Sequence, residues 1–189
     1  MASIKTTPRR LGRVVSIDPR ARRVAHAYFN NGQLKECEQR TFRDSDLSVR
    51  AEQAVIPYLI QVLDRCAPHA IVLPGARPVG ARHRSKFGRQ VMAAVAKEAL
   101  KRGIAVHVLS TKTVKEAFRE PDGQRVGDKA AMFRMVIKRL PELLSMLPDP
   151  REQAWKPEEY FTPLFNAAAM YLAWECQPSP ADKREPGRC

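Results

Sequence analysis

The chain has 189 residues, enough for one ordinary domain, and its 44% hydrophobic and 28% charged residues exclude a wholly disordered protein. Its 33 Lys and Arg residues outnumber its 20 Asp and Glu residues, which gives a formal net charge of +13. An excess of this size on a compact protein indicates a polyanionic partner, most often nucleic acid.

No apolar run reaches the roughly 18 residues that a membrane-spanning helix requires. The first residues also lack the apolar core of a secretory signal. The four cysteines stand at positions 37, 66, 176 and 189 and form no CxxC pair, which excludes a zinc knuckle and a dithiol redox motif. We therefore expect a soluble, cytoplasmic protein with no membrane partner.

Three strands are predicted near the start of the chain, after a basic segment, residues 1–10, that we expect to be flexible. The first strand is rich in β-branched residues and is followed by Pro19. Asn31 and Gly32 are typical of a tight hairpin turn between the second and third strands, so we expect these strands to be antiparallel. The three predicted strands are residues 12–18, 22–29 and 33–42.

Helices and strands alternate in the next part of the chain. Apolar residues at helical spacing from Val49 to Leu63 predict a helix with Ser48 as its N-cap, which Pro57 bends or delays. Gly103 is placed to end the helix that follows. The continuing strand, helix and strand are predicted at residues 70–73, 87–102 and 104–109.

Three helices complete the predicted order. Asp128 is placed to cap the second of them, and Thr162 with Pro163 is typical of the cap and first residue of the third. Residues 177–189 hold three prolines and are predicted to be a disordered tail. The helices are predicted at residues 110–118, 129–140 and 162–175. We expect one α/β domain, residues 11–176, with a mixed five-stranded sheet flanked by helices on both faces.

This order resembles the ribonuclease H-like fold, and in particular the RuvC-type Holliday junction resolvases, over roughly residues 12–174. Three local matches carry the resemblance: Ser16-Ile17-Asp18-Pro19, Gly127-Asp128-Lys129-Ala130 and Asn166-Ala167-Ala168-Ala169. The resemblance implies cleavage of a phosphodiester by water with two divalent ions, Mg or Mn, held by carboxylates. It also implies a homodimer.

The family pattern requires acids at the end of the first strand, at the end of the fourth strand and near the start of the last helix. Asp18 occupies the first place, although an Asp before a Pro is also a common turn residue. Residues 70–74 contain no acid, and Asn166 at the third place supplies no charge. We therefore predict a weak or absent two-metal site with Asp18 as a remnant. Three acids near helix starts, where capping also favours them, could still complete a metal site with Asp18: Glu158, Glu159 and Asp128.

Basic residues gather in one stretch that we predict to contact nucleic acid. Between positions 77 and 102 there are eight Lys or Arg residues and one acid, Glu98. Lys115 is expected at the rim of the same site. Because aromatic residues make up only 7% of the chain, duplex or branched DNA is favoured over single strands, and RNA is an alternative. The residues predicted to contact nucleic acid are Arg77, Arg82, His83, Arg84, Lys86, Arg89, Lys112 and Lys129.

Three functions are compatible with these observations. The favoured one is a RuvC-like, nucleic-acid-binding protein with weak or no nuclease activity. The second is an active, divergent endonuclease that uses Mg or Mn on Asp18 with the acids named above. The third is a non-catalytic adaptor whose basic surface binds an acidic protein.

Overall fold

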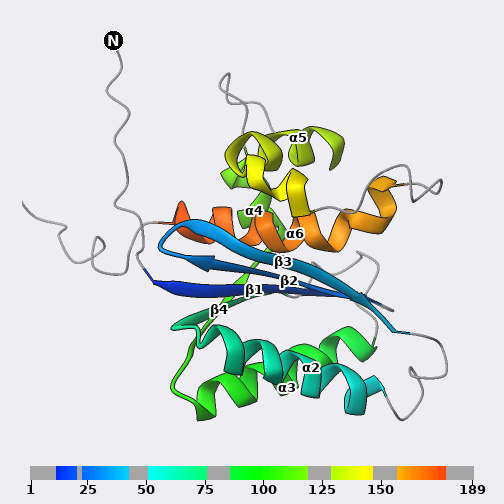
Figure 1. Ribbon diagram of the computed structural model, residues 1–189, viewed down its shortest axis with the longest axis vertical. Coiled ribbons are helices and arrows are strands. Elements are labelled where there is room, and N and C mark those ends of the chain that lie inside the picture. The colour runs from blue at the N-terminus through cyan, green and yellow to red at the C-terminus, as the bar shows by residue number, and fades with distance from the viewer. Residues whose placement is uncertain are drawn as a thin grey trace, which may run out of the picture.

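In the computed structural model, five strands form one mixed sheet in the order β3-β2-β1-β4-β5, with β1 at its centre (Figure 1). Strands β1 to β3 are antiparallel neighbours, whereas β1, β4 and β5 run parallel. The predicted mixed sheet with three antiparallel first strands is therefore confirmed. The strands are β1 (Arg13–Pro19), β2 (Arg23–Asn30), β3 (Gln33–Thr41), β4 (Ala70–Pro74) and β5 (Ala105–Leu109).

The structure describes residues 12–20, 23–42, 51–75, 86–118, 129–146 and 157–177. For residues 51–53, 86, 129, 146 and 157–161 it describes the backbone alone. The predictions for the flexible segment 1–10, the helix cap at Ser48 and the tail after residue 177 lie outside these ranges. None of the described helices is both long enough and apolar enough to cross a membrane.

The turn between β2 and β3 is the tight hairpin that the sequence predicts. Asn31 and Gly32 have φ angles of 50° and 84°, which is the conformation that a two-residue turn of type I′ requires. The Asn31 side-chain oxygen also accepts a hydrogen bond of 2.9 Å from the backbone N–H of Gly12. The turn is thereby attached to the start of the central strand.

Helices cover both faces of the sheet (Figure 1). Because side chains alternate along a strand, Val15 and Ile17 of β1 belong to the core under one helical layer, whereas Val14 belongs to the core under the other. The layer on the Val15 side consists of α2 (Ala51–Cys66) and α3 (Lys86–Lys101). The opposite layer consists of α4 (Thr111–Ala117), α5 (Lys129–Arg139), the 3₁₀ helix η1 (Pro141–Met146) and α6 (Pro157–Glu175).

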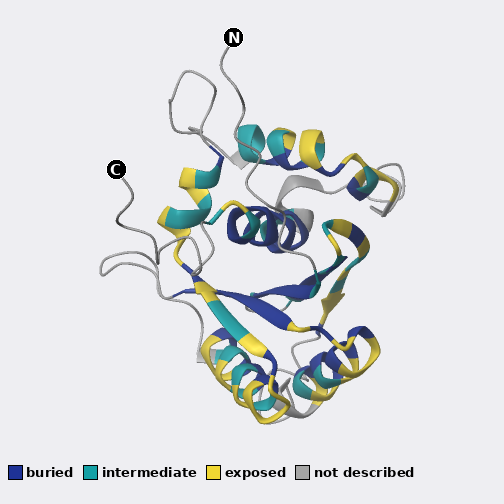
Figure 2. Cartoon of the chain, turned by 90° about the vertical axis from the view of Figure 1, so that its left-hand side faces the viewer, coloured by how far each residue is buried: buried dark blue, intermediate teal, exposed yellow. Residues whose placement is uncertain are grey.

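Helix α6 is buried along most of its described length, as the dark blue helix above the sheet in Figure 2 shows. It lies between the sheet and the outer helices, so apolar residues occur around its whole circumference. Small side chains from Ala167 to Ala169 allow a close approach, and the Ser16 hydroxyl of β1 donates a hydrogen bond of 2.7 Å to the Ala167 carbonyl. Phe29 and Tyr171 stack at a centroid distance of 3.5 Å. These contacts fix α6 directly against the centre of the sheet.

The predicted start of the last helix is wrong by more than one turn. The helix begins at Pro157 instead of Thr162, and Pro163 lies inside it. Proline removes one backbone hydrogen bond from a helix, but here the apolar packing of the following turns against the sheet offsets that loss. Pro57 also lies within a continuous helix, α2, in which the sequence predicts a bend or a delayed start.

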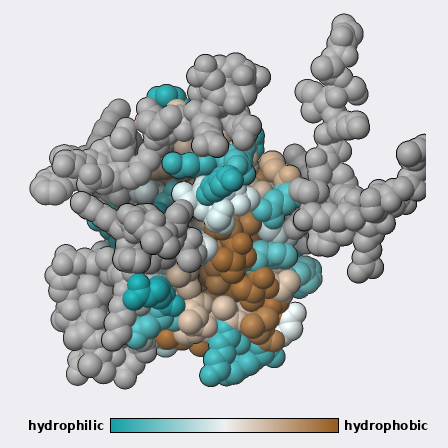
Figure 3. Space-filling model, turned by 180° about the vertical axis from the view of Figure 1, so that it is seen from behind, coloured by the Kyte–Doolittle hydropathy of each residue, from teal (hydrophilic) through white to brown (hydrophobic). Residues whose placement is uncertain are grey.

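Strand β5 forms one edge of the sheet, and part of its surface is apolar. Val108 on β5 is 62% exposed, and Leu100 near the end of α3 is 65% exposed. The molecule seen from behind shows an apolar patch in the middle of the view (Figure 3). Surfaces of this kind commonly serve association between chains, and the homodimer implied by the family resemblance stays a prediction.

Candidate functional site

Asp18 lies near the end of the central strand and is 1% exposed. It belongs to the face of β1 that packs against α6, as does Ser16 two residues earlier. Its Oδ2 atom accepts a hydrogen bond of 2.8 Å from Nε of Arg20 and one of 3.0 Å from Nδ2 of Asn166 on α6. Among the described residues, one positive charge and one amide donor therefore compensate the buried carboxylate.

A cavity of about 170 Å³ adjoins this carboxylate. It opens at the carboxyl ends of β1, β4 and β5, which is where ligands bind in sheets with parallel strands. Its polar lining includes Asp18, Arg20 and Lys115 of α4. Its apolar lining includes Pro74, Leu109, Val114, Met132 and Met170.

The described side chains of this cavity do not fit two divalent ions. Ions of this type require several oxygen ligands that together carry negative charge. Asp18 is the one carboxylate among the described lining residues, and its Oδ2 atom already accepts hydrogen bonds from two donors. Pro74 stands at the end of β4, and Asn166 presents its amide N–H, not its oxygen, to Asp18. The side chains of Glu158, Glu159 and Asp128 lie outside the described residues.

Some of the residues predicted to contact nucleic acid lie at or near this site, and others lie outside the described residues. Lys115 lines the cavity, whereas Lys112 on the same helix is exposed and lies 3.9 Å from a Glu116 carboxylate oxygen. Arg89 is exposed in the first turns of α3. Because a helix between parallel strands runs antiparallel to them, this end of α3 lies toward the carboxyl ends of the strands. Arg77, Arg82, His83 and Arg84 lie outside the described residues, as do the side chains of Lys86 and Lys129.

Arg20 was not predicted from the sequence to be part of the site. Its signal was the spacing Asp18-Pro19-Arg20, because residues two apart in an extended chain share a face. The role of Asn166 as a donor to Asp18 has no such local signal, since the two residues are 148 positions apart.

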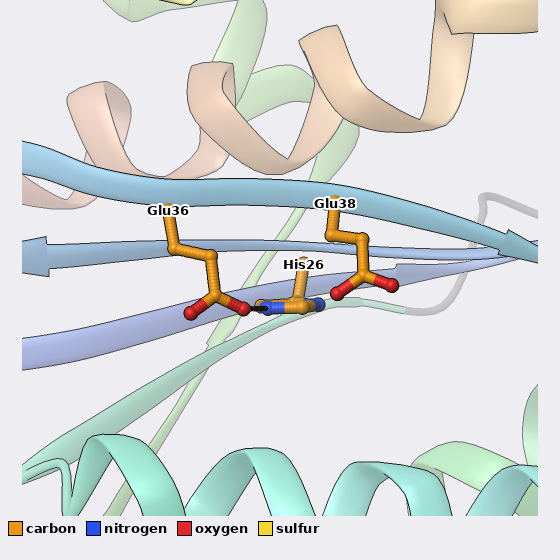
Figure 4. A group of neighbouring side chains, drawn as sticks. All are labelled: His26, Glu36 and Glu38. Carbon is orange, nitrogen blue, oxygen red and sulfur yellow. Dashed lines mark hydrogen bonds and ion pairs between the residues drawn. The ribbon is translucent and has the colours of Figure 1, made fainter. Parts of the chain in front are cut away.

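A second polar cluster lies on the opposite face of the sheet, the face that α2 covers (Figure 4). His26, Glu36 and Glu38 offer ligand atoms within 4.8 Å of one another, a spacing that a metal ion can use. However, the fully buried His26 already has partners on both ring nitrogens. Its Nε2 lies 2.7 Å from Glu36 Oε1, and its Nδ1 lies 3.0 Å from the Tyr58 hydroxyl.

These contacts have a clear electrostatic signature. The hydrogen bond from His26 lowers the pKa of Glu36 to about 2, and the Arg65 guanidinium on the same carboxylate acts in the same direction. Burial, reinforced by the negative charge of Glu38, raises the pKa of the Tyr58 hydroxyl above its usual range. Tyr58 and Arg65 both belong to α2, so the cluster attaches α2 to the β2–β3 hairpin. We interpret it as a structural network.

The comparisons with known proteins bear on the fold. No protein-family model matches the sequence, and no curated protein matches it closely enough to count as a relative. Among solved structures, it is similar to RuvC of Thermus thermophilus, with a TM-score of 0.62 and 19% identity over 85% of this chain and 92% of that one. It is also similar to T. thermophilus RuvC in complex with a Holliday junction substrate, with a TM-score of 0.63 and 18% identity over 85% and 90% of the two chains.

The chain has a RuvC-type, ribonuclease H-like fold. This agrees with the resemblance drawn from the order of the elements. At such identities the likeness shows the fold alone, and function has to be argued from the site.

Proposed function

We propose that this protein binds nucleic acid, with branched or duplex DNA as the favoured ligand, and has weak or no nuclease activity. The observation that carries the proposal is the pairing of Asp18 with Arg20 in the cavity at the carboxyl ends of the strands. In that cavity the Arg20 guanidinium compensates the charge of the buried carboxylate. We expect this cavity to receive the phosphate backbone of the nucleic acid. Its described lining residues lack the acids that a two-metal reaction needs.

The charge of the chain and the similarity to a junction-bound protein support nucleic acid as the ligand. A net charge of +13 attracts a phosphate backbone and makes binding sensitive to salt. One of the similar solved structures is a RuvC complex with a Holliday junction substrate. Branched DNA is therefore the first ligand to test, followed by linear duplex, single-stranded DNA and RNA.

The decisive experiment measures binding and cleavage on the same labelled four-way junction. Fluorescence anisotropy across a salt series, with either EDTA or Mg²⁺ present, should show binding that weakens steeply with salt and does not require the metal. Gel analysis after incubation with Mg²⁺ or Mn²⁺ should show little or no cleavage.

Two outcomes would favour the other functions. Clean metal-dependent cleavage that Asp18→Asn abolishes would establish the active endonuclease, with Glu158, Glu159 or Asp128 completing the site. Absence of binding to every nucleic acid at low salt would favour the adaptor that binds an acidic protein.

The predicted basic loop has its own test. Charge reversal by Arg82→Glu with Arg84→Glu should weaken binding to all sequences alike, because contacts to phosphates carry no sequence information. Unchanged binding would remove this loop from the proposed surface.

A further inference from the structure

The cavity beside Asp18 is richer in positive than in negative charge. Its described lining carries one carboxylate, on Asp18, and two cationic side chains, on Arg20 and Lys115. Since Arg20 neutralises Asp18 at 2.8 Å, the ammonium group of Lys115 leaves a net positive charge. The lining therefore favours an anion over a metal cation.

Arg20 is held in place but retains hydrogen-bonding capacity. Its Nε donates to Asp18, and no other described residue accepts a hydrogen bond from its guanidinium, which presents five N–H donors in a fixed fork. The side chain is 35% exposed, so solvent and ligands can reach it. An arginine fixed on one side by a carboxylate is preorganised to bind an anion on its other side.

Lys115 is available in the same way. It is exposed on α4 and pairs with none of the described carboxylates, in contrast to Lys112 of the same helix, which lies 3.9 Å from Glu116. Apolar side chains, including Met132 and Met170, form much of the remaining wall. Such walls lower the local dielectric constant and strengthen the attraction between these cations and an anion.

We infer that this cavity binds one backbone phosphodiester of the nucleic acid directly, through Arg20 and Lys115, without a divalent ion. The inference rests on the proposed function and specifies how the site engages its ligand. Arg20 donates to the phosphate with the guanidinium nitrogens that do not contact Asp18, and Lys115 contributes a second positive charge. Asp18 serves as a positioning residue, because it acts through Arg20.

The first test compares two exposed lysines in junction binding with EDTA present. Lys115→Ala should weaken binding several-fold and lower the slope of log K against log salt by about 0.9, the value for one lost phosphate contact. Lys138→Ala, which removes an exposed lysine of α5 outside the cavity, should leave the slope unchanged. Equal slopes for the two variants would overturn the inference and leave the proposed function standing.

The second test measures whether neutralising Asp18 raises or lowers the affinity for the junction. Asp18→Asn removes the negative charge but keeps an oxygen for Arg20, so junction affinity in EDTA should equal or exceed that of the wild type. Weaker binding by this variant in EDTA would contradict the inference, because it would show that junction binding requires the negative charge of Asp18 itself. Its thermal unfolding curve identifies any loss caused by misfolding.

The third test needs no nucleic acid. Titration with dimethyl phosphate should shift the Arg20 Nε–H resonance in nitrogen-proton NMR spectra of the wild type, and Lys115→Ala should reduce that shift. A shift without junction binding would retain the phosphodiester site and refute the proposed function. Junction binding without a shift of the Arg20 resonance would refute the phosphodiester site and leave the proposed function standing.

Discussion

Among the described residues, each face of the central sheet buries an Asp or His side chain, and the surroundings of these two side chains differ. His26 on β2 has both ring nitrogens engaged, by Glu36 and by Tyr58, and lies beneath α2. Asp18 on β1 borders a cavity, and its partner Arg20 is partly exposed. Burial of an ionisable side chain therefore does not mark a functional site by itself. The site is where donors and charge are available next to a space that a ligand can enter.

The largest effect on stability is expected at the cluster of His26, Glu36 and Tyr58. His26→Ala should lower the free energy of unfolding by about 3 kcal/mol, because it opens a cavity and removes the partners of Glu36 and Tyr58. Urea denaturation measures this change. The folded fraction should bind the junction with wild-type affinity. A loss of affinity in the folded protein would contradict the structural role assigned to the His26 cluster.

A smaller loss of stability is expected at the pair of Asp18 and Arg20. Arg20→Ala removes the cation that the described residues place on the buried Asp18 carboxylate and keeps the amide donor of Asn166, which should cost about 2 kcal/mol. Because the cost arises from the uncompensated charge, the double variant with Asp18→Asn should recover most of it. A double-mutant cycle by urea denaturation measures the coupling. Simple additivity would show that Arg20 does not compensate Asp18.

Tyr58 tests how α2 is attached to the sheet. Tyr58→Phe keeps the ring but removes the hydroxyl that contacts His26 Nδ1, so the free energy of unfolding should fall by about 1 kcal/mol. Hydrogen exchange should quicken in α2 more than in α6. Equal changes in both helices would indicate that the network does not act locally.

The pH dependence of stability should report the same cluster. The pKa of Glu36 is lowered from 4.5 to about 2. The stabilising contribution of Glu36 to the free energy of unfolding is therefore complete above pH 4.5 and is lost as the pH falls through about 2. Melting temperatures measured from pH 6 down to pH 2 should therefore fall more in the wild type than in Glu36→Gln. Parallel curves would mean that Glu36 titrates alike in the folded and unfolded chains.

Much of the fold could be predicted because its signals are local. The turn at Asn31 and Gly32 follows from the backbone conformations that these residues tolerate, and the strand ending near Asp18 follows from β-branched residues followed by Pro19. The start of the last helix could not be predicted in this way. Pro163 is a typical first helical residue, yet packing of α6 against the sheet carries the helix through it.

The candidate site was predicted only in part. The sequence places Asp18 at a strand end and shows that residues 70–74 lack an acid. It also places Lys115 at the rim, and the structure finds that side chain in the cavity wall. It gives no sign that Asn166 would donate to Asp18, because that contact depends on how α6 crosses the sheet.

By itself, the sequence determined the succession of strands and helices, the positive charge and the shortage of acids, because composition and short-range backbone preferences are properties of neighbouring residues. Only the tertiary structure decided that Arg20 compensates the buried carboxylate, that Lys115 shares its cavity and that His26 is enclosed on the other face. These arrangements join segments far apart in the chain, and hydrogen bonding and apolar burial select them only when the sheet and its helices pack together.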